Sequence, residues 1–335
     1  MPEPENPAAP PEADRELPQP SPPNPVFFND HGIRAGWRLL AWFAITLATA
    51  FVLLVILHAV EHSVSKETYG DLSKIALVLA VLGSTALMGK LEGRSPWSYG
   101  LSDRRWPGHF VVGALIGWLS LTLMLIGLRA AHHFSFGKDY MHGSALAVAA
   151  VLNALSFLFE VALFEEIFFR GYALYTLAEG IRFWPAAVVL SIVFAAAHLN
   201  NNGEAISGIV AVVAFGLMLC FSIWRTGSLY WAIGFHFLWD YSESFLYGVP
   251  DSGLVSPQHL LTARFSGPAW ITGGTVGPEG SWFIFVVLAG IAVVIHFVYP
   301  RRAFVIPSPR SGPRNLYPLG NREGRDSSSA VADSE

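Results

Sequence analysis

The sequence predicts an all-α membrane protein, a polytopic transmembrane bundle of about eight helices. Of its 335 residues, 53% are hydrophobic and only 14% are charged, whereas a typical soluble domain has about 25% charged residues. Its apolar runs are long enough to cross a bilayer, which takes about 20 residues in a helix. The formal net charge of -4 is unremarkable and indicates no nucleic-acid partner.

Eight apolar runs account for the expected helices, and polar tails flank them. The runs cover roughly residues 37–60, 73–90, 109–130, 146–178, 183–200, 205–224, 228–248 and 281–299. The first 25 positions hold ten prolines mixed with acidic residues. That composition cannot bury a core, so residues 1–35 are expected to be disordered. Residues 301–335 are rich in Pro, Ser and Arg and predict a second disordered tail.

The distribution of basic residues predicts the side of the membrane that each segment occupies. With the N-terminus in the cytoplasm, the cytoplasmic segments hold 16 Lys and Arg residues and the extracytoplasmic segments hold five. The positive-inside rule therefore places both termini in the cytoplasm of a multi-pass protein of the cell membrane. Segment 36–140 then holds the N-terminal transmembrane helices, 249–280 forms an extracytoplasmic loop, and 281–300 is the last transmembrane helix.

The fourth run carries three charges, those of Glu165, Glu166 and Arg170, among apolar residues. Charged side chains inside a membrane are costly and usually serve a function. On a helix, Glu166 and Arg170 stand at i and i+4 and can pair, which leaves Glu165 free. Residues 146–178 form a run of 33 residues, about 50 Å as a helix against roughly 30 Å of hydrocarbon. A span over 155–176 places Glu165 at mid-depth. A span that ends before the glutamates would instead make the charges a salt-bridged helix end at the surface.

Two histidines have a similar expected depth in later helices. His198 ends the fifth run, and His236 in the seventh run shares a helix face with Asp240 at i+4. Glu243, three residues after Asp240, is a further candidate for that polar face. Helix geometry allows Glu165, His198 and His236 to meet in the middle third of the bilayer.

Two chemistries suit these residues. In the first, a glutamate acts as general base on a water, helped by a histidine, while other groups stabilise an oxyanion. In the second, one divalent metal, with zinc as a candidate, is held by His198, His236 and Asp240 and activates the water. The H-E-x-x-H helix of the common zinc proteases is absent from the sequence.

Three motifs in this order, on successive hydrophobic helices, resemble the CPBP intramembrane protease family. The motifs are E-E-x-x-x-R (Glu165, Glu166, Arg170), F-x-x-x-H (Phe194, His198) and H-x-x-x-[ND] (His236, Asp240). The family includes the type II CAAX prenyl endopeptidases and bacterial bacteriocin-processing and immunity homologues. The resemblance covers roughly residues 140–248, and it assigns residues 141–248 to a protease core.

The resemblance implies a role for each matching residue. Glu165 is the expected base, which polarises a water together with His198, and Glu166 supports the site with its arginine partner. His236 and Asp240 form the expected oxyanion-stabilising pair, where the best-studied CAAX endopeptidases have Asn at the second position. An ionised Asp has no proton to donate, so Asp240 must be protonated, orient His236 or bind a metal. A metalloprotease and a metal-free glutamate protease both stay open.

The expected function is hydrolysis of a peptide bond in a peptide or protein substrate at or within the lipid bilayer. A core open to the cytoplasm would suit a C-terminal substrate tail of the CAAX kind. Two alternatives stay open. A catalytically silent immunity or scaffold protein would keep the fold for partner binding, although the intact motif residues argue against it. A proton-coupled transporter would use the same residues as a relay, although the sequence shows no inverted repeat.

Overall fold

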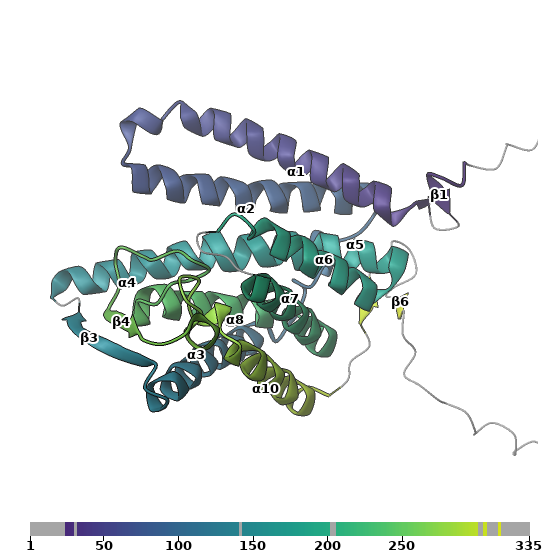
Figure 1. Cartoon of the computed structure of the whole chain (residues 1–335). Coiled ribbons are helices and arrows are strands. Elements are labelled where there is room, and N and C mark those ends of the chain that lie inside the picture. Colours follow the sequence, from purple (N-terminus) through teal and green to yellow (C-terminus); the bar gives the residue numbers. More distant parts are fainter. Residues whose placement is uncertain are drawn as a thin grey trace, which may run out of the picture.

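The computed structural model of the chain describes residues 24–29, 32–140, 143–201, 206–300, 304–306 and 314–315. Helices make up most of this part and pack against one another as a bundle (Figure 1). The α-helices are α1 (Ala35–His58), α2 (Lys66–Leu91), α3 (Trp106–Ala130), α4 (Ser144–Phe157), α5 (Tyr172–Ile181), α6 (Phe183–Ala197), α7 (Ile206–Thr226), α8 (Leu229–Tyr241), α9 (Ala269–Thr272) and α10 (Phe283–Val298).

Shorter elements connect or extend these helices. The π-helical turns are η3 (Leu158–Leu163), η4 (Glu166–Arg170) and η5 (Ser242–Tyr247), and the 3-10 turns are η1 (Glu61–Ser63), η2 (Pro96–Ser98) and η6 (Pro278–Gly280). The strands form three antiparallel pairs, β1 (Phe28–Asn29) with β2 (Gly32–Ile33), β3 (Phe134–Tyr140) with β4 (Leu261–Phe265), and β5 (Val305–Ile306) with β6 (Arg314–Asn315).

The predicted all-α transmembrane bundle is confirmed. Within the described residues, the helices that are long and apolar enough to cross a membrane are Ala35–His58, Thr68–Leu91, Trp106–Ala130 and Ile206–Thr226. Shorter apolar helices cover Ala145–Phe157, Phe183–Ala197 and Phe283–Val298. Each of the eight apolar runs contains helix. The helices therefore lie where hydropathy placed them, with one difference in the fourth run.

The fourth run is divided at Gly171. The helix that begins at Ser144 continues through η3 and η4 and ends there, and α5 begins at the next residue. Gly171 adopts φ -80° and ψ -125°, and a Cβ at this position would lie 2.3 Å from the carbonyl oxygen of Ile167. No side chain fits so close to the backbone. The excess length of this run is therefore accommodated by a second helix, α5, instead of one long tilted span.

Helix α8, which carries two of the predicted site residues, packs directly on the backbone of α3. A Cβ on Gly113 of α3 would lie 2.1 Å from the carbonyl oxygen of Trp231. On the facing helix, a Cβ on Gly234 would lie 2.1 Å from the carbonyl oxygen of Phe110, and Gly117 makes a similar close contact. Small residues let transmembrane helices approach closely, so these glycines set the position of α8.

A buried network of four charges joins the α1–α2 hairpin to the core. Arg38 of α1 lies 3.2 Å from Glu92 and 2.9 Å from Glu179 of α5, and Arg94 lies 3.3 Å and 3.0 Å from the same two carboxylates. The four side chains are at most 13% exposed. Each positive group lies next to two negative ones, and the attraction between them offsets the cost of removing the charges from water. The network therefore holds the hairpin along one side of the bundle, where Figure 1 shows it.

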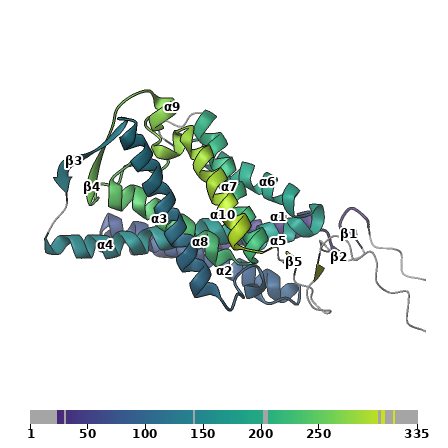
Figure 2. The same ribbon diagram turned by 90° about the horizontal axis from the view of Figure 1, so that it is seen from below.

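The two ends of the bundle differ. At one end, β3 pairs with β4 and ties the α3–α4 connection to the segment that follows α8, and the α1–α2 connection lies at this end too (left in Figure 1). We call this the β3–β4 end. The opposite end, called the network end, carries the four-charge network and the short strands near both chain termini (right in Figures 1 and 2). Of the tails predicted to be disordered, 1–35 and 301–335, all but a few residues around these strands lie outside the described residues.

Candidate active site

Four of the predicted site residues lie in or beside π-helical turns. Glu165 stands between η3 and η4, Glu166 and Arg170 are the first and last residues of η4, and Asp240 lies two residues before η5. In a π-helical turn each hydrogen bond spans five residues instead of four. Such turns are rare, and those that occur are frequently at functional sites. They also rotate the following side chains away from the directions that 100° per residue would give. Sequence periodicity therefore could not fix the orientation of these groups.

Glu166 is the centre of a buried chain of hydrogen bonds. Its Oε1 accepts from Arg170 Nη1 at 2.9 Å and from His236 Nδ1 at 2.9 Å. Glu166 is 0% exposed and Arg170 is 1% exposed. The Arg170 guanidinium also lies over the Phe194 ring, with Cζ 4.2 Å from the centroid. The pair expected at i and i+4 is therefore present, and it fixes the orientation of the His236 ring.

The second nitrogen of His236 faces two further carboxylates. A carboxylate only accepts hydrogen bonds, so Nδ1 of His236 carries the proton in its bond to Glu166. Nε2 lies 3.9 Å from Glu165 Oε2 and 3.4 Å from Asp240 Oδ2. His236 and Asp240 are buried, whereas 23% of the Glu165 side chain is exposed. Glu165 is thus the member of this group with an open face.

That open face borders a cavity of about 810 Å³, which Glu165, His198, His236 and Asp240 all line. His198 follows the last residue of α6, and its Nδ1 lies 2.8 Å from the carbonyl oxygen of Phe194. Because that oxygen only accepts, Nδ1 donates and Nε2 is left for other partners. Glu166 lies behind His236, outside the lining. The structure therefore places four of the five predicted catalytic residues around one space and the fifth directly behind it.

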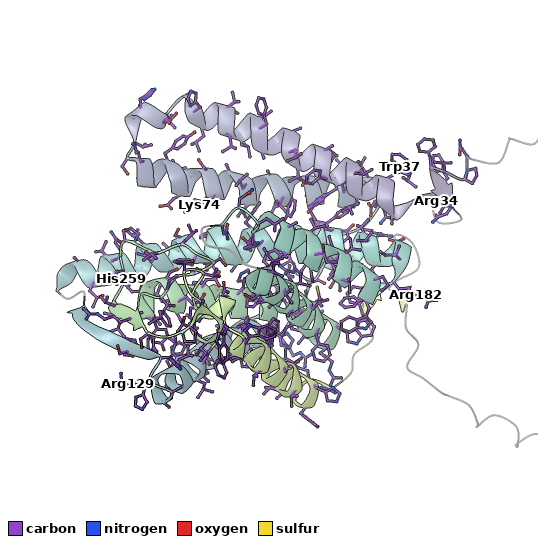
Figure 3. The ribbon with its side chains drawn as sticks, in the orientation of Figure 1. Arg34, Trp37, Lys74, Arg129, Arg182 and His259 are labelled. Atoms are coloured by element: carbon purple, nitrogen blue, oxygen red, sulfur yellow. The ribbon has the colours of Figure 1, made fainter. Side chains whose placement is uncertain are left out.

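The cavity reaches the β3–β4 end of the bundle. Its wall includes Asp71 and Lys74 near the start of α2, Asn153 and Ser156 of α4, and residues 251–258 after η5. Figure 3 shows Lys74 and His259, which follows this last segment, in one half of the molecule, and Arg34 and Arg182 in the other half. Access to the site is therefore from the end that holds the connection between η5 and α10.

Three more acidic residues lie beside Asp240. Glu243, Asp251 and Glu279 each offer a carboxylate oxygen, and with that of Asp240 these atoms all lie within 4.8 Å of one another. We call these four residues the four-acid cluster. Burial, and next the nearby Glu279 carboxylate, raises the pKa of Asp251 to about 8. Asp251 and Glu279 were missed in the sequence because they lie in the connection after η5, where no helical period links them to Asp240.

The metal site that the sequence left open as one alternative, at His198, His236 and Asp240, gains no support from this geometry. In the part of the chain that the structure describes, the ligand atoms that converge closely enough to hold an ion belong to the four-acid cluster. Asp240 is a member of this cluster, but neither His198 nor His236 belongs to it. The set is also purely oxygen-based, whereas zinc sites in proteins use mainly nitrogen and sulfur ligands.

Together, these features define a helical membrane protein with carboxylates and histidines gathered on an internal cavity. A family model described as Type II CAAX prenyl endopeptidase Rce1-like matches residues 147–242. The matched segment extends from α4 to the first residue of η5 and includes all five predicted catalytic residues. No curated protein and no solved structure matches the chain. This match over residues 147–242 supports membership of the CPBP intramembrane protease family, and at the level of the family the matched core is that of a CAAX-protease-like membrane endopeptidase.

Proposed function

We propose that the chain is a membrane endopeptidase in which Glu165 activates a water for attack on a peptide carbonyl. The observation that carries this proposal is the position of Glu165, whose carboxylate borders the cavity beside His198 with the buried Glu166–Arg170 pair close by. In the described part of the chain, the buried Oε2 of Glu165 has no hydrogen-bond partner, and 23% of the side chain is exposed to the cavity, which leaves the carboxylate available to a water. A general base must first lie within hydrogen-bond distance of the proton that it removes.

In this mechanism, Glu165 takes a proton as the water oxygen bonds to the carbonyl carbon. The same proton then passes to the leaving nitrogen as the carbon–nitrogen bond breaks, which restores the carboxylate. His198 holds the water from the other side through Nε2, because its Nδ1 is engaged by the Phe194 carbonyl at 2.8 Å. General acid–base catalysis of this kind contributes about 10²–10⁴-fold to a rate.

In the proposed mechanism, protonated His236 stabilises the oxyanion with its positive charge and its Nε2–H donor. Its ring is held between Glu166 at Nδ1 and Asp240 at Nε2, at 2.9 Å and 3.4 Å. A ring in that position donates from both nitrogens when it is protonated, and the Nε2 proton is the one that faces the cavity. Fixed donors directed at developing charge are usually the largest catalytic contribution. Asp240 has the role of orienting this ring, so it needs no proton of its own.

The proposed substrate is a peptide segment that reaches the site from the extracytoplasmic side. The cavity opens at the β3–β4 end, whereas Arg38, Arg94 and Arg182, which the positive-inside rule places in the cytoplasm, lie at the network end. This is opposite to the opening that would suit a cytoplasmic CAAX tail. A membrane-anchored peptide that extends into the extracytoplasmic space fits the opening better than a prenylated cytoplasmic one.

The activity is tested with purified protein in proteoliposomes and a library of fluorescence-quenched peptides. Wild type should cleave some of these peptides, and Glu165→Gln, which keeps the shape of the side chain, should lower kcat by at least 10²-fold. Glu61→Gln is the matched control and should leave cleavage unchanged, because Glu61 lies in the α1–α2 connection and its side chain is 40% exposed. Equal cleavage by Glu165→Gln would exclude the proposed base.

The side of access is tested with single cysteines in intact cells, since the native Cys220 is buried. Val255→Cys at the mouth of the cavity should react with a membrane-impermeant maleimide, whereas Ser95→Cys at the network end, which is also exposed, should not. Labelling of Ser95→Cys but not of Val255→Cys would place the opening in the cytoplasm. A cytoplasmic CAAX-type tail would then be the better substrate.

A further inference from the structure

The four-acid cluster combines three acids of the stretch 240–251 with one from η6. Asp240 belongs to α8, Glu243 to η5, Asp251 to the connection after η5, and Glu279 to η6. One oxygen of each lies within 4.8 Å of those of the other three. Asp240 and Glu243 are buried, and Asp251 and Glu279 are half-buried. Four carboxylates at this spacing repel one another unless a positive group lies between them.

Glu243 gives an independent indication that a cation binds here. It is 0% exposed, and neither of its carboxylate oxygens has a hydrogen-bond partner in the part of the chain that the structure describes. No Lys or Arg of that part pairs with any of the four acids, and the basic group in contact is His236, whose Nε2 lies 3.4 Å from Asp240. A buried carboxylate without a partner is strongly unfavourable, so its position calls for a positive ligand.

Neighbouring side chains hold two of the carboxylates in place. Ser244 Oγ donates to Asp251 Oδ2 at 3.1 Å, and Ser252 Oγ donates to Glu279 Oε2 at 2.7 Å. Trp239 Nε1 donates to Glu279 Oε1 at 3.2 Å. Hydrogen bonds of this kind orient the ligands of metal sites and are often as important as the ligands themselves. The cluster is therefore preorganised rather than a chance gathering of mobile surface acids.

The donor set selects a hard divalent cation, and its flexible geometry suits calcium. All four donors are carboxylate oxygens, which suit Ca²⁺, Mg²⁺ and Mn²⁺ rather than zinc or copper. Oxygens on opposite sides of a Ca²⁺ ion lie about 4.6–5.2 Å apart, because each bond is 2.3–2.6 Å, whereas Mg²⁺ needs about 4.2 Å and geometry close to an ideal octahedron. All four oxygens of the cluster lie within 4.8 Å of one another, which leaves room for Ca²⁺.

We propose that the four-acid cluster binds one divalent cation of the calcium class, which fastens the connection after η5 to the end of α8. Asp240, Asp251 and Glu279 also line the cavity, which provides the path for the ion. Because Asp240 contacts His236, the cation lies next to the candidate active site and fixes the residue that orients its histidine. The cation site does not depend on the proposed peptidase activity, and the tests of the two are separate.

Binding is measured directly with Tb³⁺ as the probe and Ca²⁺ as the competitor. Trp239, in hydrogen-bond contact with Glu279, is placed to transfer excitation to a bound Tb³⁺ ion. Purified wild type should give saturable Tb³⁺ luminescence that Ca²⁺ displaces at lower concentration than Mg²⁺. Glu243→Gln should weaken Ca²⁺ binding at least tenfold, while Asp71→Asn, which removes a cavity acid outside the cluster, should bind as wild type. Glu165→Gln should also bind normally, even if it is inactive.

Thermal unfolding supplies a second readout. The difference in stability between Glu243→Gln and wild type should change sign when calcium is added. In EGTA, Glu243→Gln should be at least as stable as wild type, because it removes an unpaired buried charge. In millimolar Ca²⁺, wild type should be the more stable of the two, because a ligand that binds the folded state raises the unfolding temperature. Absence of saturable Tb³⁺ binding in folded wild type, equal Ca²⁺ affinity in Glu243→Gln, or unchanged wild-type unfolding with Ca²⁺ would each overturn the proposal. The wild-type measurements decide the matter even if the variant does not fold.

Discussion

Replacing Arg170 with alanine should destabilise the folded protein by about 3–5 kcal/mol, the usual cost of removing one partner from a buried ion pair. Arg170 is 1% exposed, Glu166 is 0% exposed, and the two are 2.9 Å apart. The alanine also removes the contact between the guanidinium and the Phe194 ring at 4.2 Å, worth up to about 2 kcal/mol in a desolvated site. Glu166 keeps its hydrogen bond to His236 at 2.9 Å, so the lower part of the range is expected.

A double-mutant cycle separates the pair from the packing of the arginine side chain. The variants are Arg170→Met, which keeps length and loses charge, Glu166→Gln, and their combination, with unfolding free energies measured by denaturant titration in mixed micelles. The coupling energy should reach about 2–3 kcal/mol, the upper part of the range for residues in contact, and Arg170→Ala should accumulate less in the membrane. A coupling energy below about 0.5 kcal/mol, which is typical of exposed pairs, would refute the buried geometry on which the site is built.

Other parts of the structure lead to further expectations. Gly234→Val should misplace α8 and abolish activity, because even a Cβ would lie 2.1 Å from the Phe110 carbonyl; Gly127→Val, where nothing lies within 4 Å, should leave expression and peptide cleavage unchanged. Asp240→Asn should retain peptidase activity without added metal, because the amide still accepts from His236 and can also donate, yet it should weaken Ca²⁺ binding. Lost activity together with zinc found in wild type and depleted in the variant would instead indicate a metalloenzyme. Glu179→Gln should lower the unfolding temperature by weakening the network of Arg38 and Arg94; an unchanged value would show that the network is solvent-screened.

The sequence predicted those features that follow from hydropathy and from i, i+4 spacing. Apolar runs located the helices, and Glu166 with Arg170 formed the expected pair. His236 and Asp240, also at i and i+4, are 3.4 Å apart. These features depend only on helix geometry within one segment, so the spacing of residues in the sequence is enough to predict them.

Other features depend on contacts between distant segments or on irregular backbone. The break at Gly171 follows from a backbone contact with Ile167 that no hydropathy pattern records. Asp251 and Glu279 reach the site from a connection without helical period, and the π-helical turns change the side-chain directions on which a helical wheel relies. The opening of the cavity at the β3–β4 end follows from the packing of α2 and α4 around it, which the sequence pattern does not record.

The central claim is that Glu165 is the base that activates water for peptide hydrolysis. Its most direct test is the pre-steady-state cleavage rate of one identified peptide by wild type and Glu165→Gln in the same proteoliposomes, with folding of both verified by thermal unfolding. We predict a rate at least 10²-fold lower for the folded variant, with peptide binding retained. A folded Glu165→Gln protein that cleaves the peptide at the wild-type rate would contradict the claim.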